Sequence, residues 1–354
     1  MHSSSSRKVA YWVLLGVAML VIQVILGGIT RLTGSGLSIT EWNIVTGAFP
    51  PLNKQQWITE FDKYRQTPQY HLLNTGFALS DFKFIFFWEW FHRLWARLVG
   101  VVFVAGFAYL LWKKELKRQM IKPLLILFIL GALQGAIGWI MVASGLTGDA
   151  IYVKPTKLAL HFIFALGLVS YAFWFALQLL IPSKEIAYHK NIHRYTSSIL
   201  IILFFQLLYG ALMAGNKAAA AAPSWPTING DWIPSSLFKE SPLLLNFIDN
   251  GITIHFMHRV LAYLLLLLIF IWSVKVYKIR LAPDYLIKSR WMPMFFVAIQ
   301  IILGISAVLA SPGIVPNRWV FFDWVAQLHQ LTGMLLLLLM VYMLYTVKAT
   351  GPKA

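Results

Sequence analysis

The segment Phe84–Gly100, which reads FIFFWEWFHRLWARLVG, places ionisable side chains inside a stretch that is apolar enough to enter a lipid bilayer. Glu89 and His92 lie three residues apart, so a helix presents them on one face, one turn apart. Ionisable groups at membrane depth are costly and usually face a protein interior where they have a function. The segment therefore predicts an intramembrane imidazole site with a carboxylate beside it.

Three further histidines lie in apolar segments in the same way. The pair His258-Arg259 lies 166 residues after His92-Arg93, and His329 lies 168 residues after His161. Each lies several residues inside its expected span, which corresponds to a common depth of roughly 6–12 Å from one membrane face. Two imidazoles from facing helices suit the iron of a bis-histidine haem. We therefore expect two haem sites, one with His92 and His161 and one with His258 and His329.

The other histidines are expected to have different roles. Zinc or copper is the rival interpretation of the buried set, although only Glu89 could supplement the imidazoles there. His255 stands one turn before His258, where the first half has Glu89, and we do not expect it to bind iron. The histidines in polar segments are expected to be surface residues; they are His2, His71, His189 and His193.

Glu89 has no carboxylate counterpart in the second half of the chain. It either pairs with an arginine of its own helix, Arg93 or Arg97, or acts as an acid, a base or a charge stabiliser beside iron. In the second case one haem would be a resident redox cofactor and the other a reactant. Arginines that could pair with haem propionates are Arg31, Arg93, Arg97 and Arg259.

The composition is that of an integral membrane protein. Of the 354 residues 59% are hydrophobic and only 12% are charged, about half the charged content of soluble domains. The net charge of +17 resides in short loops, so membrane topology explains it better than nucleic-acid binding does. The absence of cysteine excludes disulfides, thiolate metal sites and covalent c-type haem. The start of the chain predicts a retained first helix and a bacterial inner membrane location.

Eight membrane spans are expected, which makes the fold an all-α membrane protein. One side of these spans carries 17 basic residues against three acidic ones, whereas the other side carries ten against nine. Basic loops remain in the cytoplasm, so both termini are expected there. The expected spans are Val9–Ile29, Phe84–Trp112, Pro123–Ala143, Leu158–Ile181, Ser197–Met213, Ile252–Val274, Met292–Leu309 and Trp324–Val347.

Matching residues recur in the two halves of the chain. Gln23, Gly27, Trp42 and Gly47 recur 183 residues later as Gln206, Gly210, Trp225 and Gly230. Four spans per half make the halves parallel repeats, two pseudo-symmetric four-helix bundles related by an axis along the membrane normal. We expect residues 1–182 to form the half with the substrate haem and residues 183–354 the half with the cofactor haem.

Each half also has one long loop on the outer side, over residues 32–83 and 214–251. Both loops are rich in glycine, proline, tryptophan and polar residues, and each contains a tryptophan-centred segment, Glu41-Trp42-Asn43 and Ser224-Trp225-Pro226. Loops of this kind usually cover a site. The alanine run of Lys217–Ala222 predicts a short interfacial helix.

With these residues in view, the chain resembles the haem A synthase family, whose members act in cytochrome oxidase assembly. The segments that carry the resemblance span nearly the whole chain and include GGITRLTGSGLSITEW (27–42), EFDKYRQTPQY (60–70), FKFIFFWEWFHRLWARLVG (82–100), LQGAIGWIMVASGL (133–146), KLALH (157–161), SWPTINGDWIP (224–234), HR (258–259) and LHQLTG (328–333). Some members carry a cysteine pair in an outer loop. This chain has none, so it is similar to the cysteine-poor branch, and thiol-based electron delivery is excluded.

The resemblance implies oxidation of the C8 methyl of haem O to the formyl group of haem A through a hydroxymethyl intermediate. A haem b on His258 and His329 would be the cofactor, whereas His92, His161 and Glu89 would hold and process the substrate. It also implies contacts with membrane lipid, with haem O synthase and with an electron donor, and a homo-oligomer is compatible with it. Two alternatives remain open from the residues: a dihaem b-type cytochrome that only transfers electrons, and a haem transporter.

Overall fold

The computed structural model describes residues 4–42, 46–182, 185–279, 283–316 and 318–350. Asn43 and three of the basic residues behind the topology prediction lie outside these ranges; the latter are Lys184, Arg280 and Lys353. Eight helices in the described ranges are long and apolar enough to cross a membrane, as predicted. They are α1 (Ser4–Leu32), α4 (Leu79–Trp112), α5 (Arg118–Ala143), α6 (Pro155–Leu180), α7 (Lys190–Gly215), α9 (Gly251–Tyr277), α11 (Met292–Ala310) and α12 (Phe321–Thr346).

Several helices begin earlier than the apolar runs predicted. α4 and α5 each start five residues before the expected span, and α7 starts seven residues before it. Helical hydrogen bonding continues through polar residues where the helix leaves the bilayer, so hydropathy alone underestimates the length of the helix. α10 (Asp284–Ser289) is a separate short helix before α11.

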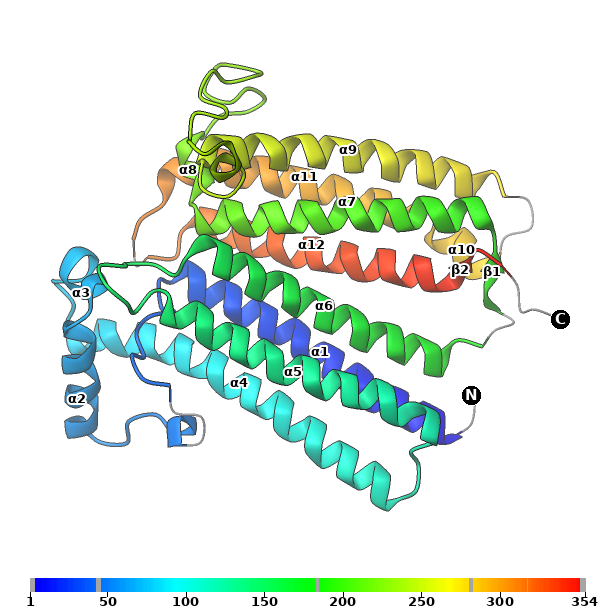
Figure 1. The fold of residues 1–354 in the computed structure, drawn as a ribbon, viewed down its shortest axis with the longest axis horizontal. Coiled ribbons are helices and arrows are strands. Elements are labelled where there is room, and N and C mark those ends of the chain that lie inside the picture. The colour runs from blue at the N-terminus through cyan, green and yellow to red at the C-terminus, as the bar shows by residue number, and fades with distance from the viewer. Residues whose placement is uncertain (1–3, 43–45, 183–184, 280–282, 317, 351–354) are drawn as a thin grey trace.

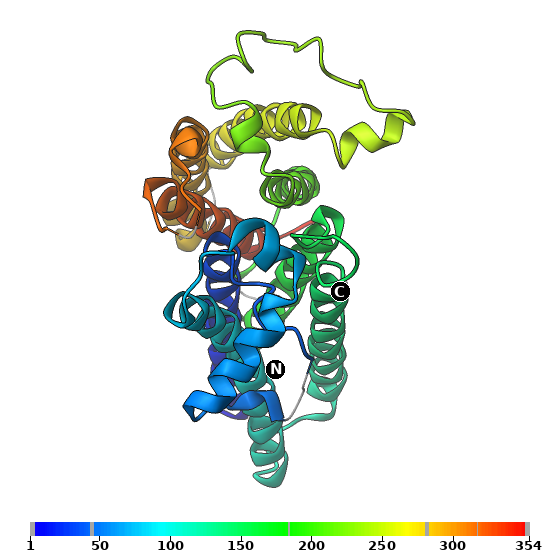
Figure 2. The ribbon, with the colours of Figure 1, turned by 90° about the vertical axis from the view of Figure 1, so that its left-hand side faces the viewer.

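The helices run side by side along one direction (Figure 1). α1 packs against α4 and α6, and α5 packs against α6; likewise, α7 packs against α9 and α12, and α11 against α12. In Figure 2 the helices of the first and the second half of the chain form two groups, which meet where α6 contacts α7 and α12 and where α1 contacts α12.

The contact between α1 and α12 is polar. The side-chain amide of Gln330 donates to the Val24 carbonyl at 3.0 Å, and that of Gln327 donates to the Ile25 carbonyl at 3.3 Å. A Cβ on Gly28 would lie 2.2 Å from the Gln327 side-chain oxygen. We name these contacts the α1–α12 seam; the glycine allows the two glutamines to reach the backbone of α1.

The main apolar core lies toward the end of the bundle where α1 begins and α12 ends. It joins residues of all eight long helices, and Trp272 of α9 lies fully buried within it, donating to the Thr196 hydroxyl at 2.8 Å. A two-residue parallel pair, β1 (Ala187–Tyr188) with β2 (Val347–Lys348), joins the connection between the halves to the end of α12. Close packing of these side chains supplies van der Waals contacts that hold the two halves together.

Two histidines predicted as surface residues are instead half-buried and structural. His189 caps α7 by accepting from the Ile192 N–H at 3.3 Å, and His193 Nδ1 lies 2.7 Å from the Val347 carbonyl oxygen. Both histidines are placed by the pairing of β1 with β2. The two strands lie far apart in the sequence, so the polar segment around the histidines does not predict this contact. His71 is exposed, as predicted, and His2 lies outside the described residues.

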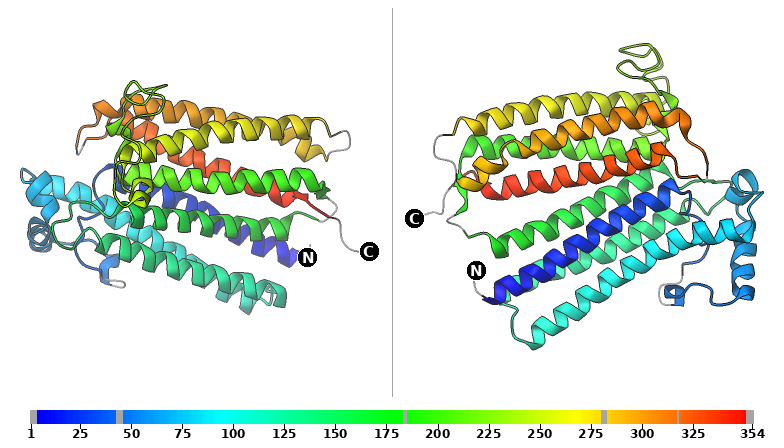
Figure 3. Two further views of the ribbon diagram at one scale, coloured as in Figure 1. Left: turned by 45° about the horizontal axis from the view of Figure 1, so that its top comes forward. Right: turned by 180° about the vertical axis from the view of Figure 1, so that it is seen from behind.

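The two long loops gather at the opposite end of the bundle from Ser4 and Thr346 (Figures 1 and 3). The first loop contains η1 (Thr46–Ala48), α2 (Lys54–Arg65) and α3 (Pro68–Leu73), and its aromatic side chains pack on the start of α4 around Phe82. The second contains α8 (Ala218–Ala221), which confirms the predicted short helix, and η3 (Leu243–Phe247). A further turn, η4 (Ser311–Gly313), ends α11.

Candidate functional site

The four membrane histidines lie on α4, α6, α9 and α12, toward the end of the bundle that carries the long loops, and each is half-buried. The rings of His258 and His329 are neighbours in an edge-to-face arrangement, with centres 6.2 Å apart and planes inclined at 73°. The structure therefore brings these two histidines together, as the sequence predicted, and the pairing of His92 with His161 stays a prediction.

Each imidazole lies against a glutamine on the preceding long helix. In the first half the amide nitrogen lies 3.2–3.5 Å from both ring nitrogens and also donates to the main-chain oxygen of the same histidine at 3.2 Å. In the second half it lies 3.3 Å from the Nε2 atom. The pairs are Gln23 with His92, Gln134 with His161, Gln206 with His258, and Gln300 with His329.

A glycine follows each of these glutamines by four residues, on the same helix face. A Cβ on any of the four would lie 2.8–3.3 Å from the Cε1 atom of the corresponding imidazole. These glycines are Gly27, Gly138, Gly210 and Gly304. The imidazole edge thus rests on the bare backbone of the neighbouring helix. We name each glutamine and glycine together a Gln-x3-Gly cradle.

Sequence reasoning found only half of these cradles. Gln23 with Gly27 and Gln206 with Gly210 were noted as a repeat with no role attached, and the cradles on α5 and α11 were missed. The signal that would have found them is the recurrence of glutamine and glycine four residues apart in each helix that precedes a histidine helix.

Glu89 is buried, with 2% of its surface exposed, and its carboxylate is fully engaged. The Ser38 hydroxyl and the Ile39 N–H donate to its Oε2 atom at 2.7 and 2.9 Å, and Arg93 donates to its Oε1 atom at 2.6 Å. Of the two roles expected for Glu89, the ion pair with Arg93 is therefore present. Three donors hold the two carboxylate oxygens in place.

Arg93 also fixes the first loop over the site. It donates to the main-chain oxygens of Ile39 and Glu41 at 3.2 and 3.1 Å, and its guanidinium lies 4.8 Å from the ring centre of Trp42. The loop segment that follows α1 is thus tied to the helix that carries His92. This use of its donors differs from the propionate binding expected for Arg93.

The second half repeats this arrangement with a neutral partner. Arg259 donates to the His255 Nε2 atom at 3.1 Å, in place of the carboxylate, and to the main-chain oxygens of Ser224, Pro226 and Thr227 at 2.5–3.0 Å. Ser224 is the repeat equivalent of Glu41, so both arginines bind the same loop position. His255 is 1% exposed.

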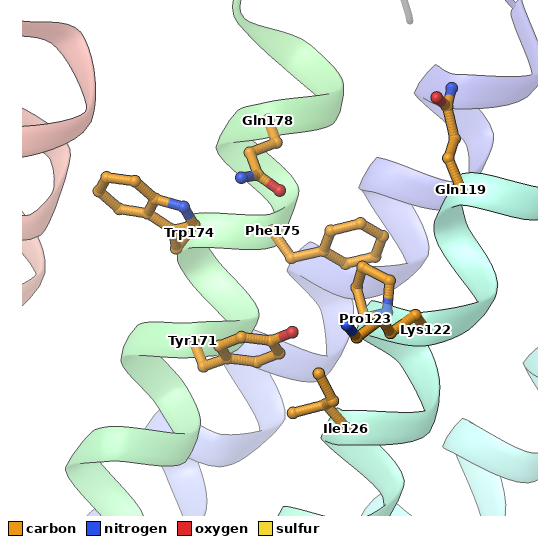
Figure 4. Close-up of a pocket in the computed structure, with 8 residues that line it drawn as sticks. All are labelled: Gln119, Lys122, Pro123, Ile126, Tyr171, Trp174, Phe175 and Gln178. Atoms are coloured by element: carbon orange, nitrogen blue, oxygen red, sulfur yellow. The ribbon is translucent and has the colours of Figure 1, made fainter. Parts of the chain in front are cut away.

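A cavity of about 260 Å³ opens beside Arg93. The loop residues 39–42 form one wall, and the end of α5 with residues 146–147 forms the other, including Trp139, which follows Gly138. Another cavity, of about 350 Å³, lies between α5 and α6 at the far end of the bundle, where Tyr171 and Phe175 face Pro123 and Ile126 (Figure 4). Only the first of these adjoins the residues of the site.

The donor sets fit haem better than a polydentate metal site. Among the residues described, no three His, Cys, Asp or Glu side chains converge, so the available ligands are imidazole pairs. An iron between two imidazoles needs ring centres roughly 6 Å apart, since each Fe–N bond takes about 2 Å and each ring centre lies about 1 Å beyond its nitrogen. The 6.2 Å separation of His258 and His329 meets that requirement.

The comparison with known proteins agrees with the site. Residues 10–341 match the COX15-CtaA family, described as cytochrome oxidase assembly protein. Similar proteins include the heme A synthases of Paracoccus denitrificans (39% identity, 88% of this chain and 83% of the relative), Methylorubrum populi (40%, 93% and 84%) and Flavobacterium johnsoniae (38%, 96% and 98%). A match over most of the chain, with relatives of this identity and coverage, shows that this protein belongs to the COX15-CtaA family of cytochrome oxidase assembly proteins.

Proposed function

We propose that this protein is a haem A synthase, which oxidises the C8 methyl of haem O to the formyl group of haem A through a hydroxymethyl intermediate. The observation that carries the proposal is the set of four imidazoles, each lying in a Gln-x3-Gly cradle, within a chain whose relatives bear the name heme A synthase. Two haem-sized ligand pairs in one chain accommodate a cofactor and a substrate together.

His258 and His329 would hold a resident haem b, whose iron supplies one-electron redox chemistry. The ring separation supports this assignment, as does a fixed hydrogen bond: His329 Nδ1 lies 3.0 Å from the Gln300 carbonyl oxygen. A ligand imidazole usually donates its second N–H to such an acceptor, which fixes its tautomer and orientation. This bond fixes the orientation of the His329 ring, whose Nε2 atom lies 3.3 Å from the Gln300 amide nitrogen.

His92 and His161 would bind the substrate haem O. The cavity beside Arg93 supports this choice, because it opens next to the residues that adjoin His92 and His161, and a reactant must enter and leave. Trp42 and Trp139 would offer apolar contact to the macrocycle there.

Glu89 would act on the substrate as a fixed anion. It lies one helical turn from His92, and oxidation of a methyl carbon at the edge of the macrocycle builds up positive charge that a carboxylate stabilises. Its oxygens already accept three hydrogen bonds, which makes electrostatic stabilisation a better role than proton abstraction.

The two halves, residues 1–182 and 183–354, would be parallel repeats in a bacterial inner membrane, with both termini in the cytoplasm. Support comes from the equivalent packing of α1 with α4 and of α7 with α9, and from the shared loop position that both arginines bind. Dioxygen would serve as oxidant and oxygen source, and a membrane or external donor would supply two electrons, with two protons, for each oxygen inserted. Haem O would be delivered by haem O synthase, with membrane lipid around the bundle and the active unit as monomer or homo-oligomer.

Extraction of haem from cells that express the protein with haem O synthase tests the proposal. We expect haem A in the extract, and we expect haem O alone when His92 is replaced by alanine. Haem O that remains unchanged with the intact protein would favour a dihaem cytochrome, and the absence of bound haem from the purified protein would favour a transporter. A reporter fused after residue 350 should be active in the cytoplasm, whereas one inserted at Lys54 should be active outside.

A further inference from the structure

We propose that each Gln-x3-Gly cradle is the positioning device for one ligand histidine, and that it sets the orientation and hydrogen bonding of the imidazole toward iron. This inference rests on the ligand assignment proposed above. It adds eight residues to the functional set: Gln23, Gly27, Gln134, Gly138, Gln206, Gly210, Gln300 and Gly304.

The glycines carry the first part of the argument. A Cβ at 2.8 Å from His161 Cε1, as Gly138 would have, or at 3.0 Å from His329 Cε1, as Gly304 would have, forces the imidazole to move. Gly135 lies on α5 only three residues before Gly138, yet nothing lies within 4 Å of its Cβ position. Close approach to an imidazole therefore distinguishes the cradle glycines from other helix glycines of the chain.

The glutamines carry the second part. All four side-chain oxygens are buried and lack a hydrogen-bond partner in the described structure. Few other buried side-chain atoms of the described residues lack a partner. A buried amide with an unsatisfied oxygen costs free energy, so an apolar side chain would serve packing better. Four equivalent exceptions, each beside a histidine, point to a partner that is present only when the site is loaded.

An imidazole bound to iron supplies that partner. Coordination uses one ring nitrogen and leaves an N–H on the other, which needs an acceptor. A half-turn of the glutamine amide presents its oxygen in place of its nitrogen. The main chain of the same residue serves where it is closer, as the Gln300 carbonyl does for His329. In both cases the acceptor comes from the cradle glutamine.

The experiment uses the purified holoprotein and measures bound haem b, its low-spin EPR signal and the rate at which haem transfers to apomyoglobin. Gln206→Leu should release haem about 10–100-fold faster, as is usual when a partner of a metal ligand is removed, and should shift the EPR signal. Gln300→Leu should have a smaller effect, because the main-chain carbonyl of residue 300 still accepts from His329. Gly304→Ala should weaken binding further, because it displaces the ring itself. Gly135→Ala and the exposed Gln178→Leu are the matched controls.

The proposal is overturned if Gln206→Leu and Gly304→Ala keep the EPR signal and the release rate of the controls. A lower melting temperature without a spectral change would assign the cradles a purely structural role and would also overturn it. If Gly304→Ala does not accumulate, Gln206→Leu decides, because leucine demands no additional backbone space. Retention of haem b by His329→Ala would instead refute the ligand assignment, so the two failures are distinguishable.

Discussion

The two halves share one framework and differ in charge at the position one turn before the membrane histidine. In both, an arginine one residue after the histidine binds the loop that follows the first helix of the half, and it also binds the side chain one turn before the histidine. That side chain is Glu89 in the first half and His255 in the second. The ion pair in the first half is neutral overall, whereas in the described structure Arg259 has no carboxylate among its hydrogen-bond partners. The arginine next to the second histidine therefore lacks the counter-charge that its equivalent has.

This difference suits a division of labour. Under the proposed assignment the Glu89 carboxylate would stabilise positive charge as it develops on the substrate, whereas the cationic Arg259 near the cofactor haem would favour its reduced form. Both halves attach the loop through an arginine although the side chain one turn before the histidine differs, so loop attachment and chemistry are separable functions in this proposal. The predictions below test whether that separation holds.

The largest effect is expected from the axial ligands of the second half. His258→Ala or His329→Ala removes one of two imidazoles, and the haem b content of the purified protein should fall almost to zero. His255→Ala should retain the b-type optical spectrum, because its Nε2 atom is bound by Arg259. The reverse result would move the ligand role to His255.

A large and selective effect is expected at Glu89. Glu89→Gln should lower the rate of haem A formation by about 10²–10⁴-fold while haem b remains bound, and haem O or its hydroxymethyl derivative should accumulate in the extract. Gln is nearly isosteric, so it can still accept from Ser38 and Ile39. Normal haem A output would reduce Glu89 to a structural partner of Arg93.

The paired arginines should differ in their effect on stability. Arg93→Gln leaves a buried carboxylate without its counter-charge, which costs about 3–5 kcal/mol. Arg259→Gln leaves a neutral imidazole, which costs about 1–3 kcal/mol. Thermal unfolding in detergent should show a larger decrease in melting temperature for Arg93→Gln. Equal decreases would mean that loop attachment, rather than charge, dominates both contributions.

The smallest effect is expected from His255→Glu, which gives the second half the charge pattern of the first. The new carboxylate would pair with Arg259, and the midpoint potential of haem b should fall by an amount on the order of tens of millivolts. Redox titration measures the shift. An unchanged potential, with the haem still bound, would show that charge at this position does not reach the iron.

The sequence predicted the parts of this molecule that depend on local pattern. Eight apolar runs correspond to eight helices, and histidines at matching depths correctly predicted that His258 and His329 lie together. The uses of Arg93 and His193 were not predicted, because their partners lie 52–54 and 154 residues away in the chain. The cradles on α5 and α11 were not predicted for another reason. The role of a single glutamine in an apolar helix can be recognised only when the imidazole beside it is known.

The α1–α12 seam has a mechanical consequence for the enzyme. Gln330 directly follows His329, and the carbonyl it binds belongs to Val24, which directly follows Gln23 of the His92 cradle. The histidine sites of the two halves are thus connected through the main chain of α1 and the side chains of α12, by this bond and by the second one from Gln327 to Ile25. A rotation of one half against the other would have to break these bonds before it altered the distance between the two sites. The seam therefore opposes a change in the spacing of the two sites.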